Sequence, residues 1–199
     1  MTTIAANTAA APAASTPPAP LPDHPALGPV KSHFAGQGLK VAEFRGQITI
    51  VASREKVHQV LKFLKEDPRC AFDFCCDVAG IDYLGYPEAM GRFAVVYNLI
   101  STTLNHRLFV KTYLDPTLDP SGTLDDPGLH TPSACDLWSG CNWPEREVYD
   151  LFGIRFDNHP DLRRILLWEK YPAHPLRKDY PLTGRGERES YRVIDRESA

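Results

Sequence analysis

Residues 145–154 read EREVYDLFGI, and residues 159–166 read HPDLRRIL. An ordinary solvated helix would lack the large apolar residues of this stretch, and a core helix would lack its four charges within residues 145–150. Charged and apolar residues interleaved this closely predict a semi-buried network of ion pairs at an interface with another protein.

The basic residues of this stretch can neutralise its acids. Arg146 and Asp150 are four residues apart, a spacing that places opposite charges side by side on one helix face. Arg163 and Arg164 come later in the sequence and can neutralise the remaining acids. If the network is buried, removing one partner should cost about 3–5 kcal/mol, because an uncompensated charge remains.

Acid–base catalysis is the alternative interpretation of this cluster. It would use the carboxylates of Glu145, Glu147 and Asp150, with His159 as their partner. However, Glu145 and Glu147 are two residues apart, so their side chains point to different helix faces. We therefore favour a structural or interface role for the cluster over a catalytic one.

Upstream of this stretch, the sequence predicts a hairpin and then a helix. Two β-forming stretches, 41–44 and 48–51, flank a glycine-containing turn and predict the hairpin. Ser53 can cap a helix whose apolar residues recur at helical spacing, namely Val57, Val60, Leu61 and Leu64. Pro68 ends that helix, because the residue before proline disfavours the α region.

Further strands and a second helix complete the predicted fold. Residues 72–83 read as a strand, and residues 92–100 and 106–114 form the clearest strand pair. In the last of these, two sets of residues alternate, Leu108, Val110 and Leu114 against Arg107, Phe109 and Lys111. A helical region is expected over 133–152, with Gly153 just after its end. This order predicts an α+β fold, a small mixed, mostly antiparallel sheet with helices on one face.

The chain is long enough, at 199 residues, for one domain with a substantial core. Residues 1–30 are rich in Ala, Pro and Thr and predict a disordered tail that fits neither a secretory signal nor a mitochondrial transit peptide. Residues 31–160 are expected to form the globular domain. Residues 161–199 are too rich in proline for a continuous helix and too apolar for a solvated tail, so we expect an extended arm on a partner protein.

Charge and composition restrict the function classes. The net charge of −3, with acids and bases mixed along the chain, argues against a nucleic-acid-binding protein. The longest apolar runs, such as residues 93–97, are far shorter than the ~20 residues that a membrane span requires, so a role at a membrane would be peripheral. The odd number of cysteines, five, favours reduced thiols in a cytoplasmic compartment.

The cysteines lack the spacing of a metal centre. Cys75 and Cys76 are adjacent and would point to opposite faces of a strand, Cys135 and Cys141 are six apart, and no Cys-x2-Cys occurs. The Gly-x-Gly at 36–38 lacks the third glycine of a nucleotide-binding loop, and no Gly-x-Ser-x-Gly is present. We therefore expect no metal, no cofactor and no catalytic residue on this chain.

Residues 145–166 fit a spaced pattern known from one protein family. The pattern is Glu-Arg-Glu, two residues, an acid, two apolar residues, six residues, His or Lys, three residues, a basic residue or Pro, one residue and two aliphatics. Its positions are Glu145, Arg146, Glu147, Asp150, Leu151, Phe152, His159, Arg163, Ile165 and Leu166. A second block, HPLRKDYPL, occupies residues 174–182. Over roughly residues 40–182 the chain resembles the 30-kDa subunit family (the C subunit) of the respiratory NADH:quinone oxidoreductase, complex I.

This resemblance implies a peripheral-arm subunit that carries neither cofactor nor catalytic residue. It implies contact with the D subunit, which forms the quinone site, proximity to the iron–sulfur B and I subunits, and a place at the cytoplasmic face of a bacterial inner membrane. The residues that would fold and dock the signature region are Glu145, Arg146, Glu147, Asp150, His159, Arg163 and Arg164. Those expected to contact the quinone-site D subunit are Arg177, Lys178, Asp179 and Tyr180.

Three alternatives to this function stay open on the sequence alone. The first is the equivalent subunit of a related membrane-bound hydrogenase or of a complex fed by ferredoxin or a deazaflavin. The second is a stand-alone hydrolase that uses the acidic cluster and His159. The third is an assembly factor that leaves the finished complex.

Overall fold

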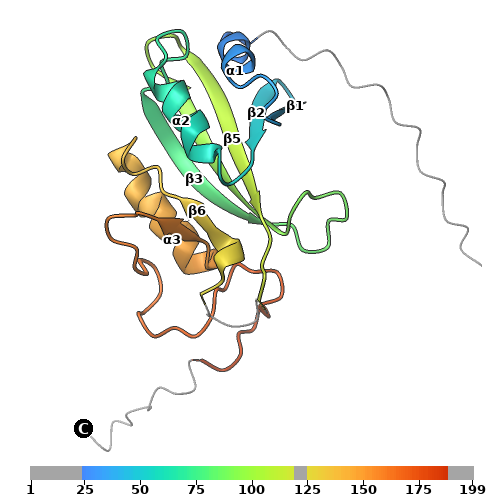
Figure 1. Cartoon of the computed structure of the whole chain (residues 1–199). Coiled ribbons are helices and arrows are strands. Elements are labelled where there is room, and N and C mark those ends of the chain that lie inside the picture. Colours follow the sequence, from blue (N-terminus) through green and yellow to red (C-terminus); the bar gives the residue numbers. More distant parts are fainter. Residues whose placement is uncertain (1–23, 119–124, 188–199) are drawn as a thin grey trace, which may run out of the picture.

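A five-stranded sheet forms the centre of the structure, a computed structural model that describes residues 24–118 and 125–187 (Figure 1). The strands follow the order β1-β2-β5-β4-β3 across the sheet, with bounds Lys40–Phe44, Gln47–Ala52, His106–Leu114, Phe93–Ser101 and Phe74–Asp82. Neighbouring strands are antiparallel except β2 and β5, which are parallel. The predicted α+β fold with a mixed, mostly antiparallel sheet is confirmed.

The helix α2, Val57–Glu66, crosses in front of the sheet in Figure 1. It buries the four apolar residues expected from the sequence, Val57, Val60, Leu61 and Leu64. Asp67 ends the helix in an extended conformation before Pro68, as predicted. The expected side-chain cap by Ser53 is wrong, because no side chain caps this helix. Instead, the backbone carbonyl of Ser53 accepts hydrogen bonds from the amides of Lys56 and Val57.

The first helix, α1, spans Leu27–His33 and packs against α2. Ala26, Leu27 and Val30 are buried, so folded structure begins before the boundary expected at residue 30. The alanine- and proline-rich composition of the preceding stretch concealed this short apolar spacing. Residues 1–23 and 188–199 lie outside the described residues, so the disordered tail stays a prediction.

The third helix, α3, spans Asn142–Phe152 and begins nine residues later than the helical region expected from position 133. The intervening residues form a loop and a 3₁₀ turn, η2, at Ser139–Cys141. The end of the helix is as predicted, since Gly153 has a left-handed φ of 75°. A short parallel pair, β6 (His130–Pro132) and β7 (Arg155–Asp157), flanks α3, and a 3₁₀ turn η1 spans Pro127–Leu129.

The described residues after β7 contain neither helix nor strand. We call residues 161–187 the C-terminal segment. It begins close to α3 and runs along the lower part of the molecule in Figure 1. Among the described helices, none has the length and apolarity needed to cross a membrane.

Gly80 allows α3 to lie close to the sheet. A Cβ at this position of β3 would be 2.6 Å from a ring carbon of Phe152 and 3.1 Å from a methyl of Val148, both on α3. A side chain at position 80 would force the Phe152 ring or the helix itself to move. The close approach of α3 to β3 therefore depends on the absence of a side chain at this position.

Replacing Gly80 with alanine should lower the free energy of unfolding by about 1–3 kcal/mol, because the new methyl group overpacks the contact with Phe152. Urea denaturation of the two proteins measures the difference. Gly140→Ala is the matched control, since a Cβ there meets nothing within 4 Å. Equal stability of Gly80→Ala and wild type would contradict this account.

Candidate functional site

The carboxylate of Asp150, near the end of α3, binds the start of the C-terminal segment. One oxygen, Oδ1, accepts a hydrogen bond from Arg164 at 2.6 Å. The other, Oδ2, accepts from three successive backbone amides, those of Ile165 (3.1 Å), Leu166 (2.8 Å) and Leu167 (2.9 Å). The Asp150 side chain is fully buried. One buried carboxylate therefore fixes the path of the chain after residue 163.

These contacts keep Asp150 ionised. Burial alone would raise the pKa of this carboxyl, but the hydrogen bonds from the Leu167 amide, from Arg164 and from the amides of Leu166 and Ile165 outweigh it. The net effect is a pKa below the usual value. The charged form is therefore the one that the folded protein stabilises.

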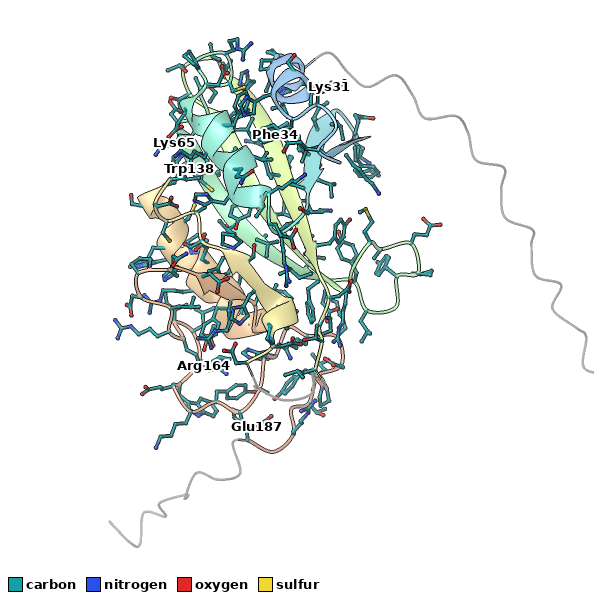
Figure 2. All side chains as sticks on the ribbon, viewed as in Figure 1. Lys31, Phe34, Lys65, Trp138, Arg164 and Glu187 are labelled. Carbon is teal, nitrogen blue, oxygen red and sulfur yellow. The ribbon has the colours of Figure 1, made fainter. Side chains whose placement is uncertain are left out.

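Arg164 extends the same network to the backbone. Its guanidinium donates to the carbonyl oxygens of Asp150 (3.1 Å), Tyr171 (2.9 Å) and Ala173 (3.1 Å), in addition to the Asp150 carboxylate. Its side chain is only 10% exposed. Figure 2 shows Arg164 in the lower part of the molecule, where the C-terminal segment passes α3. A planar guanidinium with several donors suits this task better than an ammonium group.

The C-terminal segment also caps the end of α3. The last carbonyls of a helix have no partner within it. Here the Asp150 carbonyl accepts from Arg164 and His174, that of Leu151 from the Leu176 amide (3.1 Å), and that of Phe152 from Arg177 (2.6 Å). His174 is buried, and burial lowers its pKa to about 4, so its ring is neutral near pH 7.

The predicted ion pair between Arg146 and Asp150 is wrong. Both oxygens of Asp150 are occupied by the segment that begins at Arg164. Arg146 instead donates to the carbonyl oxygens of Arg163 (3.1 Å) and Arg164 (3.4 Å), and lies 4.0 Å from Asp161. Arg146 and Asp150 are four residues apart in the helix, but Asp150 pairs with Arg164, fourteen positions away, instead.

Arg163 plays a different part from its neighbour. Its side chain is 73% exposed and pairs with Asp161 at 2.9 Å. The expectation that Arg163 neutralises the acids of α3 is therefore wrong. An exposed pair of this kind contributes little to stability.

Glu145 forms no ion pair with any described residue, which corrects the expectation that it belongs to a charge network. Its carboxyl is fully buried and accepts from the Ser133 hydroxyl (2.6 Å) and the Ala134 amide (2.7 Å), with the Cys135 thiol at 3.5 Å. Burial raises the pKa of Glu145 to about 7, although the three donors lower it in part. Glu147 is exposed, so the two glutamates do lie on different faces.

His159 joins the loop after β7 to the start of α3. Its Nε2 donates to the Asn142 carbonyl (3.1 Å), and its Nδ1 accepts from the Asp161 amide (3.0 Å). Ligand atoms of Cys135, Glu145 and His159 lie within 4.8 Å of one another, and zinc accepts these residue types. Both ring nitrogens of His159 already hold a hydrogen bond, however, and a metal would have to break one. The geometry therefore favours a structural role for this trio.

The residues predicted to contact the quinone-site D subunit lie partly against their own domain. Arg177 is buried at the end of α3, and Asp179 pairs with Arg92 at 2.9 Å. The Tyr180 hydroxyl is 2.6 Å from that of Tyr171. Lys178 has an exposed side chain. Contact with another protein stays a prediction for all four residues. Arg177 is the least accessible of them, because its guanidinium is buried.

Sequence reasoning missed the acids and bases that hold the far end of this segment. The buried carboxylate of Asp82, at the end of β3, accepts from the Lys178 amide (2.8 Å) and lies 3.4 Å from Arg92. The sequence offered one signal for the contact between Asp82 and Arg92. An acid ends the apolar strand β3, and a base directly precedes the next strand, β4. His174 and Ser133 gave no local signal, because their partners are distant in the sequence.

Several large apolar side chains of this region are partly or largely exposed in the described structure. They are exposed on the surface of α3 and the C-terminal segment and comprise Trp143, Leu166, Trp168, Leu176 and Leu182. Four of these five residues belong to the C-terminal segment, which makes that segment a candidate binding surface.

Comparison with known families identifies the family of this chain. The model of the respiratory-chain NADH dehydrogenase 30-kDa subunit family matches residues 50–186. The chain belongs to this family. The matched range includes both sequence blocks on which the resemblance was based.

Two relatives in the 30-kDa subunit family show how far the likeness extends. The C subunit of NADH-quinone oxidoreductase from Geobacter sulfurreducens is 47% identical over 163 residues, which cover 82% of this chain and 91% of the relative. The protein of the same name from Geobacter metallireducens is 44% identical over the same shares. These relatives are subunits of an enzyme complex.

Solved structures agree with the family assignment. The trypsin-resistant fragment of Nqo5 superposes with a TM-score of 0.56 at 36% identity, covering 68% of this chain and 98% of the fragment. A chain of the archaeal membrane-bound sulfane sulfur reductase superposes with a TM-score of 0.61 at 20% identity, covering 86% of this chain and 94% of that one. The second likeness shows the fold alone.

Replacing Arg164 with alanine should lower the free energy of unfolding by about 3–5 kcal/mol, because the buried Asp150 carboxylate would lose its charged partner. Arg163→Ala, one residue away and exposed, is the matched control and should change it by no more than about 0.5 kcal/mol. Guanidinium denaturation at pH 7 measures both. Similar losses from the two substitutions would refute the division of roles between these arginines.

Replacing Glu145 with glutamine should flatten the dependence of stability on pH. With a pKa raised from 4.5 to about 7, folded Glu145 keeps its proton where the unfolded chain releases it. Its contribution is therefore fully present below about pH 4.5 and is lost as pH rises to about 7, up to roughly 3 kcal/mol. Denaturation series at pH 5 and pH 8 test this.

Glu147→Gln is the control for that series, because Glu147 lies two residues away on the exposed face. It should leave the difference in stability between pH 5 and pH 8 unchanged. An unchanged difference in Glu145→Gln as well would mean that Glu145 is ionised throughout this range.

Proposed function

We propose that this chain is a structural subunit of the peripheral arm of a proton-translocating NADH:quinone oxidoreductase. It carries no cofactor and no catalytic residue of its own. It docks on the D subunit, which forms the quinone site, beside the iron–sulfur B and I subunits. Electrons pass from NADH through FMN and iron–sulfur clusters of other subunits to quinone. The chain lies at the cytoplasmic face of a bacterial inner membrane and associates with the membrane through the complex only.

The observation that carries this proposal is the way the C-terminal segment is held. Asp150 and Arg164 fix its backbone to α3, whereas the side chain of Leu166 is 60% exposed and that of Leu176 is half exposed. A segment whose backbone is already ordered loses little conformational entropy on binding. Exposed leucines on such a segment provide the apolar contact of a stable interface.

Other observations weigh against the alternatives. The hydrolase would need Glu145 to reach a substrate, but this carboxyl is fully buried. The equivalent subunit of a hydrogenase or a ferredoxin-fed complex is not favoured, because the relatives described above are named for NADH-quinone oxidoreductase. An assembly factor would be recovered in less than stoichiometric amount with the finished complex, which a purification can measure.

The direct test is to tag the chain, solubilise membranes gently and identify the proteins that co-purify in stoichiometric amount. A large complex with flavin, iron–sulfur clusters and NADH:quinone activity is the expected result. Recovery with hydrogenase subunits would replace the proposal with the related complex. Recovery of the chain alone, from cells that respire through such a complex, would overturn the proposal.

The double substitution Leu166→Ser and Leu176→Ser should reduce the recovery of the quinone-site D subunit at least ten-fold. Both leucines are exposed, so the isolated chain should keep its melting temperature while the interface loses its apolar contact. Leu104→Ser is the control, since this leucine is equally exposed in the turn between β4 and β5. Normal recovery of the double variant would place the interface elsewhere.

A further inference from the structure

The face of the sheet that points away from α2 and α3 is a second surface on which no described helix packs. We infer that it is the docking surface of a neighbouring protein subunit, one that presents apolar side chains and at least one carboxylate, which pairs with Lys111. This inference rests on the proposed function, because it takes the chain to be one subunit of a complex. It concerns a surface on the other side of the sheet from α3, whose end holds the C-terminal segment.

The strand register shows which residues share this face. In β5 the buried residues Leu108, Val110 and Leu114 point towards the helices. The residues between them, including Phe109 and Lys111, therefore point the other way. Their cross-strand partners extend the same face over the neighbouring strands. The apolar members that matter here are Val51, Phe74, Val96, Ile100, Phe109 and Tyr113.

This face is unusually apolar for one in contact with water. An antiparallel sheet with one solvated face normally alternates apolar residues with polar ones, and the polar residues face outwards. In β4, however, the outward positions include Val96 and Ile100. Phe74 at the outer strand is 51% exposed. No described helix packs on these residues. The loop after β3 contacts Tyr113 through Tyr83, and the remaining apolar area is available to a partner.

Lys111 lies at the centre of this face. It stands opposite Val96 on one side and Val51 on the other. Its Nζ donates to the Tyr83 hydroxyl at 2.9 Å and lies 5.5 Å from the ring centre of Tyr83 and 5.6 Å from that of Tyr113. Among the described residues, no carboxylate lies within ion-pair distance of it. A half-buried ammonium held by aromatic rings, with no counter-charge among the described residues, is suited to a carboxylate of another protein.

The charge of the face decides between a second copy and a different protein. Its strand residues include the cations Lys40, Arg107 and Lys111 and one acid, Asp77, which leaves an excess of positive charge. Two such faces would repel each other in a symmetric dimer. The complementary partner is therefore acidic, and the mixture of apolar and basic residues fits a protein surface.

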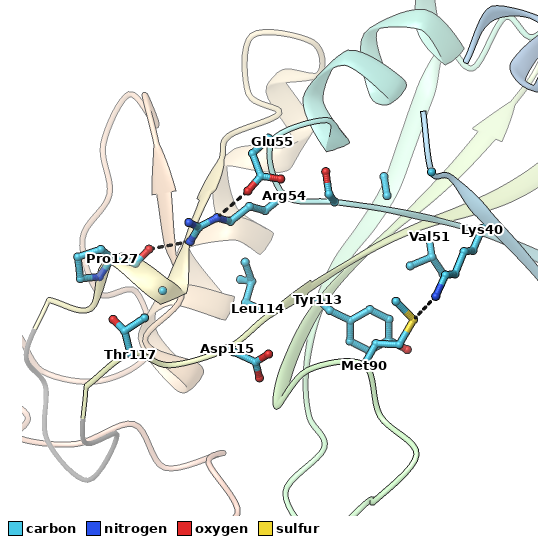
Figure 3. A pocket seen from close by; sticks show the side chains of 14 residues that line it. Lys40, Val51, Arg54, Glu55, Met90, Tyr113, Leu114, Asp115, Thr117 and Pro127 are labelled. Carbon is cyan, nitrogen blue, oxygen red and sulfur yellow. Dashed lines mark hydrogen bonds and ion pairs between the residues drawn. The ribbon is translucent and has the colours of Figure 1, made fainter. Parts of the chain in front are cut away.

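A hollow at the edge of this face offers a place for a side chain of the partner. Its volume is about 510 Å³, and it lies where β2 and β5 end (Figure 3). Val51 and Tyr113 of the open face form part of its wall, and Lys40 reaches across it to the sulfur of Met90 at 3.7 Å. Buried pockets that receive an anchoring side chain are where interfaces gain most of their affinity.

Photo-crosslinking in the intact complex tests this inference. A benzoylphenylalanine at position 109 should give a covalent adduct with one neighbouring subunit, and the crosslinked peptide should contain Asp or Glu. The same probe at position 62, on the exposed side of α2, is the control and should give a different pattern. An adduct with a second copy of this chain, an adduct with lipid only, or no adduct at position 109 would each overturn the inference.

Charge reversal gives an independent measurement. Lys111→Glu should lower the recovery of the crosslinked subunit at least ten-fold and make that recovery sensitive to salt, whereas Lys62→Glu should leave it within two-fold. Full recovery of Lys111→Glu would overturn the inference. If the tagged wild-type chain brings down no oxidoreductase complex, the proposed function fails. If it brings down the complex but position 109 gives no adduct, only the open-face inference fails.

Discussion

The unpaired carbonyl groups at the end of α3 are the constraint on which the rest of this region depends. A helix that ends inside the protein must find donors for its last carbonyls. Here the C-terminal segment supplies them through Arg164, His174, the Leu176 amide and Arg177. The segment therefore needs no secondary structure of its own in order to be ordered. Its path is fixed by the helix that it caps.

Asp150 adds the second half of this arrangement. The three amides from residue 165 to residue 167 converge on one carboxylate oxygen, so the segment and the helix satisfy each other's backbone groups. Loss of Arg164 would leave a buried charge, and loss of Asp150 would leave buried donors, and both are costly. This arrangement fixes the backbone of Leu166 and leaves its side chain exposed for contact with another protein.

Two carboxyl groups on α3, five residues apart, have pKa values shifted in opposite directions. Asp150 receives a guanidinium and three amides, so its pKa is lowered and its contribution to stability is lost as pH falls through that value. Glu145 receives a hydroxyl, one amide and a thiol, none of them charged, so burial raises its pKa to about 7. The sequence shows two acids on one helix. Only the set of donors around each one decides which acid carries the charge.

That difference explains how much could be predicted. The hairpin, α2 and the β4–β5 pair followed from local periodicity, because alternation and helical spacing are properties of neighbouring residues. The family assignment followed from spaced motifs. The partners of Asp150 and Glu145 did not follow, since Arg164 is fourteen residues from Asp150 and Ser133 is twelve residues from Glu145. The i, i+4 rule selected the nearest base, Arg146, and tertiary structure overrode it.

The partners of three cations, Arg92, Arg164 and Lys111, distinguish charges paired within this chain from a charge that a partner protein can pair. Arg164 and Arg92 are both held by carboxylates of this chain. Lys111 is held by aromatic rings and the Tyr83 hydroxyl but has no carboxylate among the described residues. A partly buried charge that lacks a counter-charge contributes less to the stability of the isolated chain than a paired one. Such a cost is tolerated most readily where a partner removes it, and the apolar residues around Lys111 are those that an interface requires.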